Sequence, residues 1–193
     1  DTTSTFSITA TDDENQTSSA RSFSITVTNN APSNNFNTVE YTGTGAAQAI
    51  SVGFKPDFTW IKETNDTDSH FLQDSLRGST MTLYSSSTAA QFDETQAVTS
   101  FASNGFNLGS YTGVNLSGNT YVSWNWKAGG APTATNSAGA GNAPTLGSVM
   151  IDGTASTSAL AGTLAIEKIS ANTNSGFSII EWDGSDANAT IAH

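Results

Sequence analysis

The residues that could support nucleophilic catalysis are few in this sequence. His70 and His193 are the only histidines in the 193-residue chain, and there is no cysteine. A Ser-His-Asp set could be drawn from Ser75, His70 and Asp74, which lie close together in the sequence. Such a set needs a nucleophile elbow and an oxyanion loop around it, and neither pattern accompanies these residues. The sequence therefore does not predict a nucleophilic enzyme.

Paired carboxylates are the second chemistry to consider, because glycoside hydrolysis uses two carboxyl groups about 5 to 10 Å apart across a cleft. The acidic residues that could supply such a pair are Glu40, Asp57, Asp74, Glu181 and Asp183. Asp74 and Arg77 are spaced as a structural ion pair or a capped turn would be. We expect no enzymatic activity and no cofactor, and a glycan-degrading enzyme ranks last among the functions considered.

Aromatic residues beside glycine-containing turns suggest carbohydrate binding. Such a site needs exposed rings next to amide and carboxylate hydrogen-bonding groups. The candidate rings are Tyr41, Tyr111 and Trp182, each beside a turn where a ring can stay exposed. The alternative is that Tyr41 and Trp182 pack inside a sandwich. The two interpretations differ in whether the rings are accessible and clustered.

The composition indicates an all-β protein. The chain has 17 acidic and 6 basic residues, a formal charge of -11, and only 12% charged residues. Short alternating runs of Thr, Val, Ile and aromatic residues favour strands over helices. Phosphate binding requires basic clusters, which are missing, so nucleic acid is not an expected partner. No apolar run reaches membrane-spanning length, so membrane insertion is not expected.

The order of the alternating runs predicts two parts joined by a linker. Residues 1–30 form a hairpin, residues 31–35 a linker, and residues 36–193 an antiparallel β-sandwich. Within the sandwich, residues 129–148 are of low complexity and are predicted to form a long crossover or exposed loop. Asn104 and Gly105 predict a tight hairpin turn. Alternation in residues 120–127 predicts a core face made by Val122, Trp124 and Trp126.

An internal similarity links the two ends of this sandwich. Residues 177–193 align with residues 36–52, and the identical pairs are Phe36/Phe177, Glu40/Glu181, Gly43/Gly184, Ala46/Ala187 and Ile50/Ile191. Each copy is predicted to be a hairpin closed by a Gly-containing turn. The second copy is too short to bury its own apolar face, so we expect it to pair with strands of residues 36–128 in one sandwich. Since its hairpin stops early, we expect the domain to be truncated at its C-terminus.

The N-terminal hairpin resembles the closing hairpin of immunoglobulin-like or cadherin-like modules. The resemblance depends on Ala10-Thr11-Asp12 and on Asn29-Asn30-Ala31-Pro32 after an alternating strand. In cadherins the linker binds calcium through an aspartate, where this chain has Asn29. Ca²⁺ takes six to eight oxygen ligands. We therefore predict that Asp12, Asp13 and Glu14 form a solvated turn and that the junction is metal-free and somewhat flexible.

A second resemblance covers residues 36–193. The chain is similar to a domain that recurs in tail and appendage proteins of tailed bacteriophages, through the ordered motifs YTGTG, GFKPDFTWIK, HFLQDSLRG, SSSTAA, SFASNGFNLG and TYVSWNWKAGG. The resemblance implies a concanavalin-like or jelly-roll sandwich in a structural component of a phage virion, such as a tail fibre. No catalytic residues are implied.

This resemblance also implies the partners. We expect a homotrimer that contacts other tail proteins on the virion, because a chain with so few charges carries little of the charge patterning that protects edge strands from pairing. Attachment to the host surface is a further expectation. The alternative function is a lectin-like module that binds host glycan.

Overall fold

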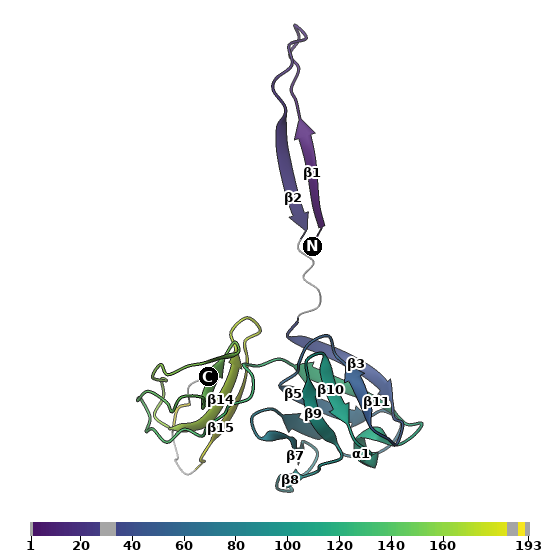
Figure 1. Cartoon of the computed structure of the whole chain (residues 1–193), viewed down its shortest axis with the longest axis vertical. Coiled ribbons are helices and arrows are strands. Elements are labelled where there is room, and N and C mark those ends of the chain that lie inside the picture. Colours follow the sequence, from purple (N-terminus) through teal and green to yellow (C-terminus); the bar gives the residue numbers. More distant parts are fainter. Residues whose placement is uncertain (1, 28–33, 185–188, 192–193) are drawn as a thin grey trace. The chain divides into compact units, whose positions relative to one another are not determined.

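The computed structural model describes residues 2–27, 34–184 and 189–191. The chain divides into two compact units, Asp1–Ser33 and Asn34–His193, which are coloured along the sequence in Figure 1. The predicted junction, including Asn29 and Pro32, lies outside the described residues.

The first unit is the predicted hairpin. Strand β1 (Thr2–Ile8) pairs antiparallel with β2 (Arg21–Val27), and Phe6 lies directly opposite Phe23 with the ring centroids 5.7 Å apart. Side chains of equal parity share one face of a ribbon. One face therefore carries Phe6, Ile8, Phe23 and Ile25, which are 42–57% exposed. A two-stranded ribbon with an exposed apolar face is marginally stable by itself.

The acidic turn of this unit is organised by its own backbone. The carboxylate of Asp12 accepts a hydrogen bond from the Gln16 amide at 2.7 Å, and Asn15 has a positive φ of 62°. Asn tolerates that conformation better than most residues. The turn thus uses one of its three carboxylates to hold its own shape.

The second unit is built around a sandwich of two antiparallel sheets. The strands of its six-stranded sheet, in spatial order, are β3 (Phe36–Thr42), β11 (Thr120–Trp126), β5 (Phe58–Glu63), β6 (Phe71–Asp74), β7 (Gly78–Tyr84) and β8 (Phe92–Asp93). The three-stranded sheet contains β4 (Gln48–Ser51), β10 (Gly105–Leu108) and β9 (Val98–Ala102). Among the described residues there is one helix, α1 (Thr112–Asn115).

The core lies between these two sheets. Its fully buried members from the six-stranded sheet are Ile61, Phe71 and Tyr121, and those from the three-stranded sheet are Ile50, Val98, Phe106 and Leu108. Burial of such side chains contributes about 1.5 to 3 kcal/mol each. The all-β antiparallel sandwich predicted from composition and alternation is confirmed.

The predicted core face of β11 is wrong. The buried side chains of this strand are Tyr121, Ser123 and Asn125, whereas Val122, Trp124 and Trp126 are only half-buried. The polar pair is accommodated inside because its hydrogen bonds are made to the neighbouring strand. Ser123 Oγ donates to the Val39 carbonyl at 3.3 Å, and Asn125 Nδ2 donates to the Asn37 carbonyl at 3.1 Å. The tryptophans consequently occupy the outer side of the sheet.

The predicted hairpin at residues 36–52 is also wrong. Strands β3 and β4 belong to different sheets, because β3 pairs with β11 and β4 pairs with β10. The turn between them crosses from one layer to the other. A Cβ atom at Gly43 would lie 2.2 Å from the Leu116 carbonyl oxygen, so this crossing packs against the loop after α1. By contrast, β9 and β10 form the predicted hairpin, but its turn residues are Ser103 and Asn104 rather than the predicted Asn104 and Gly105, because Gly105 already pairs with Ala102.

Residues 149–182 form a four-stranded sheet of their own. Its strands, in spatial order, are β13 (Thr154–Ala155), β12 (Val149–Ile151), β14 (Ile166–Asn172) and β15 (Phe177–Trp182). Strands β12 and β14 are parallel, and β14 and β15 are antiparallel. The sheet has a separate small core of Val149, Ile166 and Ile169. Strand β15 therefore does not pair with residues 36–128, contrary to the sequence prediction.

Contact between the two parts of this unit is made by side chains instead. The Phe177 ring lies 6.0 Å from Phe58 and 5.7 Å from Trp126, measured between centroids. Ile191, which the alignment pairs with Ile50, forms an isolated bridge with Gly162. The predicted contact of the second copy with residues 36–128 is thus present through Phe177, without shared strand hydrogen bonds.

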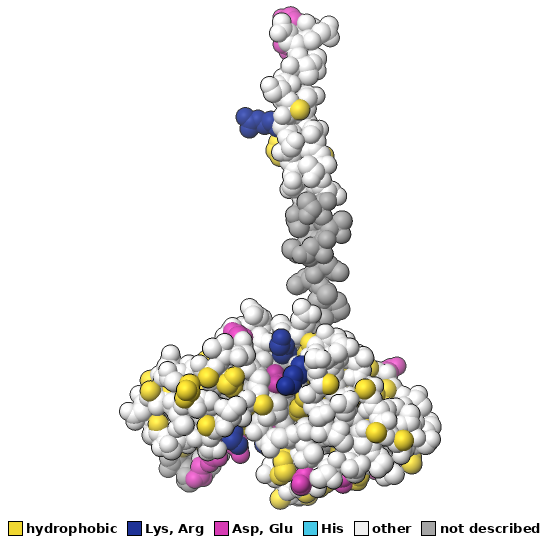
Figure 2. Space-filling view, viewed as in Figure 1, with side chains coloured by type: hydrophobic (Ala, Val, Ile, Leu, Met, Phe, Trp, Pro, Cys, Tyr) yellow, Lys and Arg dark blue, Asp and Glu magenta, His cyan; other side chains and the backbone are white. Residues whose placement is uncertain are grey.

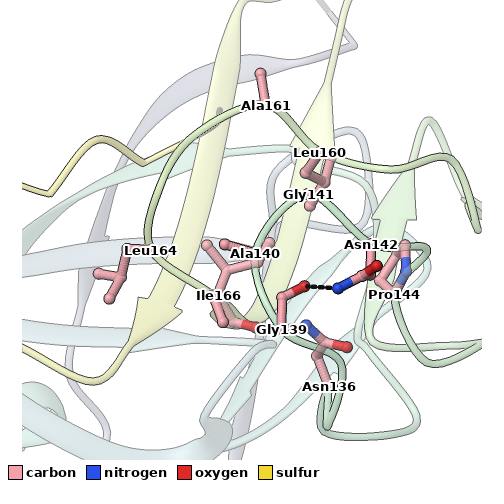
Figure 3. A pocket seen from close by; sticks show the side chains of 11 residues that line it. Asn136, Gly139, Ala140, Gly141, Asn142, Pro144, Leu160, Ala161, Leu164 and Ile166 are labelled. Carbon is pink, nitrogen blue, oxygen red and sulfur yellow. Dashed lines mark hydrogen bonds between the residues drawn. The ribbon is translucent and has the colours of Figure 1, made fainter.

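The low-complexity segment contains no strand, as predicted, yet it is held in place. Asn136 donates to the Ile166 carbonyl at 2.9 Å and accepts from the Thr145 amide at 3.0 Å. Figure 3 shows the small cavity that this segment makes with the chain before β14. Its volume is about 10 Å³, room for no more than one water molecule. The segment thus lines this cavity together with Leu160 and Ile166 and leaves no room there for a larger ligand.

Candidate functional site

The outer side of the six-stranded sheet carries an unusual number of large rings. We call the following set the outer aromatic face: Phe36, Phe58, Trp60, Trp124 and Trp126. Phe36 is 38% exposed, and the other four side chains are half-buried. The sandwich core lies on the opposite side of the same strands, so these rings are not needed to fill it.

The centre of this face is a row of apolar side chains across four strands. Trp124 pairs with Trp60, Trp60 with Leu72, and Leu72 with Leu83. The Trp60 and Trp124 rings are 5.8 Å apart at an interplanar angle of 62°, the edge-to-face geometry that aromatic pairs favour. Trp60 Nε1 donates to His70 Nδ1 at 2.9 Å, which fixes the orientation of the indole.

Polar side chains border this row. Thr38 is opposite Trp124 and Glu40 is opposite Val122, and both are exposed. The Lys62 ammonium donates to the Asp66 carbonyl at 2.8 Å, so its charge is held by the next loop. The arrangement offers ring surface in the middle and hydrogen-bonding groups at the edge.

One end of the outer aromatic face is partly covered. Phe36 and Phe58 pack against Trp126 with centroid distances of 4.9 and 5.4 Å, and Phe177 from β15 stacks on Trp126. At the other end of the face, Trp60 and Trp124 contact each other edge to face.

The three rings predicted from sequence are not brought together. Tyr41 stacks on Tyr121 at 5.1 Å and donates its hydroxyl to the Val114 carbonyl at 2.7 Å. Burial raises the pKa of the Tyr41 phenol above its usual range. Tyr111 packs edge-on against Phe71 at 5.7 Å, and both tyrosines pack against the main core.

Trp182, in β15, is 48% exposed. It belongs to a different sheet from Tyr41. A carbohydrate-binding role for Tyr41, Tyr111 and Trp182 stays a prediction. The outer aromatic face was missed because its tryptophans were assigned to the core. The signal that could have revealed it is the alternation of Tyr121, Ser123 and Asn125. The small polar side chains of this set can be buried when they hydrogen-bond to a neighbouring strand.

The candidate catalytic residues each bond to a different partner. Ser75 Oγ donates to Asp57 at 2.8 Å, His70 accepts from Trp60, and Asp74 forms an ion pair with Arg77 Nε at 2.7 Å. The Leu76 and Arg77 amides also donate to Asp74, so the predicted ion pair and capped turn are both present.

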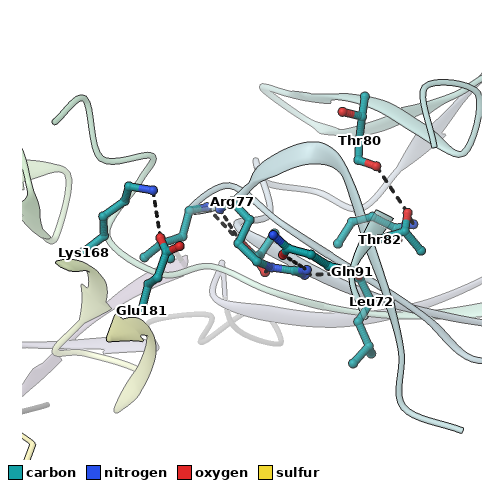
Figure 4. Close-up of polar contacts among 10 residues, drawn as sticks. Leu72, Arg77, Thr80, Thr82, Gln91, Lys168 and Glu181 are labelled. Carbon is teal, nitrogen blue, oxygen red and sulfur yellow. Dashed lines mark hydrogen bonds and ion pairs between the residues drawn. The ribbon is translucent and has the colours of Figure 1, made fainter. Parts of the chain in front are cut away.

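The Arg77 guanidinium extends the same network. It also donates to the Leu72 carbonyl and to Gln91, at 3.2 and 3.4 Å. Figure 4 shows these contacts, together with the separate ion pair of 2.8 Å between Lys168 and Glu181. Glu181, Asp57 and Asp74 are therefore engaged in local bonds of the fold.

Asp57 joins the two parts of the second unit. This residue is 3% exposed, and its Oδ2 accepts hydrogen bonds from the Ala128 and Gly130 amides at 2.8 and 3.3 Å. The amide between them, that of Gly129, donates to Ser170 Oγ of β14 at 2.9 Å. We call this arrangement the Asp57 joint. The two motifs GFKPD and WKAGG meet here: the first supplies the Asp57 acceptor, and the second supplies the donor amides of Ala128 and Gly130.

Asn115 has a similar organising role at the other end of the sandwich. Its Oδ1 accepts from the Thr44 amide at 2.8 Å, and its Nδ2 donates to the carbonyls of Ala46 and Gly109 at 2.6 Å. Asn115 is fully buried. It fixes the YTGTG turn where the chain crosses between the two sheets.

Other kinds of site were sought in the same part of the chain. In residues 2–27, 34–184 and 189–191, no three His, Asp or Glu side chains are placed to hold a metal ion. None of the described helices is long and apolar enough to cross a membrane. A shallow groove of about 360 Å³ lies on the three-stranded sheet, lined in part by Gln48, Gln96 and Asn107. On the face seen in Figure 2, charged and hydrophobic side chains are sparse among the other side chains and the backbone, which are drawn in white.

The fold and the site define an all-β sandwich domain with an aromatic outer sheet face and a second small sheet joined to it at Asp57. The family model described as "Domain of unknown function (DUF7483)" matches residues 31–150, and the chain belongs to this family. The match includes the whole sandwich and ends within β12, while β13–β15 lie beyond it. No curated protein and no solved structure matches the chain.

Proposed function

We propose that this chain is a structural module of a phage virion appendage, located on the extracellular particle, and that it binds its partner through the outer aromatic face. The observation that carries the binding role is the pair of half-buried rings Trp60 and Trp124 on the side of the sheet opposite the core, away from the end that Phe177 covers. Their placement outside costs hydrophobic stabilisation that the fold could otherwise use. Aromatic rings are enriched where protein surfaces bind partners, so a binding role is the best account of their position.

The location is tested on purified virus particles from the culture that carries the gene. Antibodies against residues 34–193 are expected to label an appendage of the particle in immunoelectron microscopy. The control is the same antibody preparation pre-absorbed with the recombinant chain, which is expected to give no label. Absence of the chain from purified particles by mass spectrometry would refute the virion role.

A second candidate function, binding of host glycan, is favoured by one feature of the same face. Thr38 and Glu40 are exposed beside Trp124 and Val122, which places hydrogen-bonding groups next to a ring. Sugar recognition uses ring stacking together with such groups. A glycan would therefore use Trp60 and Trp124 rather than the scattered rings predicted from sequence.

The glycan function makes a sharp prediction for two matched substitutions. Trp124→Ala is expected to weaken binding to a glycan selected on an array by about five- to twelvefold, since stacking one ring contributes on the order of 1 to 1.5 kcal/mol. Trp182→Ala, which removes an exposed ring from the four-stranded sheet, is expected to leave the affinity within about twofold. Isothermal titration measures both. Equal losses in the two variants would exclude the outer aromatic face as the glycan site.

Oligomerisation into a homotrimer is the third part of the proposal. It is supported by the exposed apolar face of the β1–β2 ribbon, which self-association would cover. Light scattering of the full-length protein at micromolar concentration is expected to give three times the chain mass. Phe6→Ser with Phe23→Ser is expected to shift the mass toward the monomer, whereas Ser7→Ala with Ser22→Ala, on the other face, is not. A monomeric wild-type protein would count against the trimer.

A further inference from the structure

A row of polar side chains crosses the inner face of the six-stranded sheet. By strand register, Asn37 is opposite Asn125, Asn125 is opposite Thr59, and Thr59 is opposite Gln73. Gln73 Nε2 donates to Thr82 Oγ1 at 3.0 Å, which extends the row to β7. Thr59, Gln73, Thr82 and Asn125 are completely buried. This is an uncommon content for the interior of a sandwich, where apolar residues prevail.

Three oxygen atoms in this row have no hydrogen-bond partner among the described residues. They are Thr59 Oγ1, Gln73 Oε1 and Asn125 Oδ1. Their side chains occupy adjacent positions on three neighbouring strands, with Thr59 in the middle. Buried polar groups in native proteins are almost always bonded to protein or ordered water. Three such atoms on residues paired across adjacent strands therefore point to one shared partner.

The donor groups of the two amides show where that partner lies. Asn125 Nδ2 is bonded to the Asn37 carbonyl of β3 and to the Ser123 carbonyl and hydroxyl of its own strand. Gln73 Nε2 is bonded on the opposite side, to Thr82 of β7. The Thr82 hydroxyl donates in turn to the Thr80 carbonyl at 3.3 Å, visible in Figure 4, so Gln73 must present its nitrogen to Thr82. Both amide oxygens are thus left for β5, where the Thr59 hydroxyl lies.

Counting protons identifies the partner. The three oxygens have one proton among them, that of the Thr59 hydroxyl. A water molecule brings two protons and can accept a third hydrogen bond. We propose that one internal water donates to Asn125 Oδ1 and Gln73 Oε1 and accepts from Thr59. All three groups are then satisfied, and the water makes three hydrogen bonds, the usual number for a buried water.

A metal ion fits these atoms less well. The three oxygens are neutral, and Ca²⁺ takes six to eight oxygen ligands with carboxylates among them. A water in this place would cross-link β11, β5 and β6, the strands whose outer sides carry Trp124, Trp60 and Leu72. This internal site does not depend on the proposed function of that face.

A crystal structure at about 1.8 Å resolution or better tests the proposal. We expect one density peak within about 2.6 to 3.2 Å of all three oxygens. Absence of a peak, or a direct hydrogen bond from Thr59 to either amide, would overturn it. Crystals grown with rubidium chloride distinguish a monovalent cation. An anomalous peak at this position would also overturn the water assignment.

Two variants provide a second measurement. Thr59→Val keeps the shape and removes the hydroxyl, so the water loses its only donor and the peak is expected to disappear or to lose most of its occupancy. Thr59→Ser keeps the hydroxyl, and the peak is expected to remain. An undisturbed peak in Thr59→Val would contradict the proposed bonding. If Thr59→Val does not fold, the wild-type and Thr59→Ser structures still decide the question.

Discussion

Replacing Asp57 by alanine is expected to lower the free energy of unfolding by about 3 to 5 kcal/mol, because three hydrogen-bond donors would lose their common acceptor. The carboxylate is almost fully buried and accepts from the amides of Ala128 and Gly130 and from the Ser75 hydroxyl. Alanine would leave these donors unpaired in the interior. Each unpaired buried donor costs about 1 to 3 kcal/mol.

Urea unfolding followed by circular dichroism measures this loss. Asp93→Ala is the matched control, because Asp93 is an exposed aspartate at the edge strand β8 and its loss is expected to cost less than about 0.5 kcal/mol. Asp57→Asn, which keeps one acceptor oxygen but turns an NH₂ group toward donors, is expected to fall between the two. An Asp57→Ala protein as stable as Asp93→Ala would show that the Asp57 joint does not hold the unit together.

Gly129→Ala is expected to detach the four-stranded sheet from the sandwich at a cost of about 3 kcal/mol or more. A Cβ atom at this position would lie 2.2 Å from the Met150 carbonyl oxygen and 2.5 Å from that of Ala171. Both contacts are with backbone atoms of β12 and β14, which cannot turn aside as a side chain would. The Gly129–Ser170 hydrogen bond would be lost with the contact.

The neighbouring glycine supplies the control. Gly130 has a φ of 93°, but a Cβ atom there meets nothing within 4 Å. Gly130→Ala is therefore expected to cost only the backbone strain, about 1 to 2 kcal/mol. Hydrogen exchange measures the difference. In Gly129→Ala, peptides of β12, β14 and β15 are expected to exchange faster while those of β9 and β10 keep their protection. Identical exchange in both glycine variants would rule out a role for Gly129 in docking this sheet.

Much of the fold could be predicted from the sequence because strand alternation is a local property. The runs around Phe6 and Phe23, the hairpin at Asn104, and the alternation of residues 120–127 all correspond to strands. The absence of strands from residues 129–148 was predictable too, since small residues alone cannot bury a sheet face. The ion pair of Asp74 with Arg77 is likewise a local feature.

The candidate site could not be predicted, because alternation has a period of two and does not say which face is inside. In β11 the large apolar rings suggested that the tryptophans face the core. Hydrogen bonds from Ser123 and Asn125 to β3 instead allow these polar residues to lie inside. The partner strand needed for those bonds begins about 80 residues earlier, outside any local pattern. The same limit explains why the sequence left open whether Tyr41 is exposed or packs inside the sandwich, where Tyr121 and Val114 contact it.

The sequence by itself determined that this protein is all-β, with a separate N-terminal hairpin and with few charges, because composition and alternation act through neighbouring residues. Only the tertiary structure decided which sheet each strand joins and which rings face outward. The similarity of residues 36–52 and 177–193 illustrates the difference. Both copies begin with a strand, yet β3 pairs with β11 and β15 with β14. Pairing depends on hydrogen-bond partners that the fold brings from distant parts of the chain, as at the Asp57 joint.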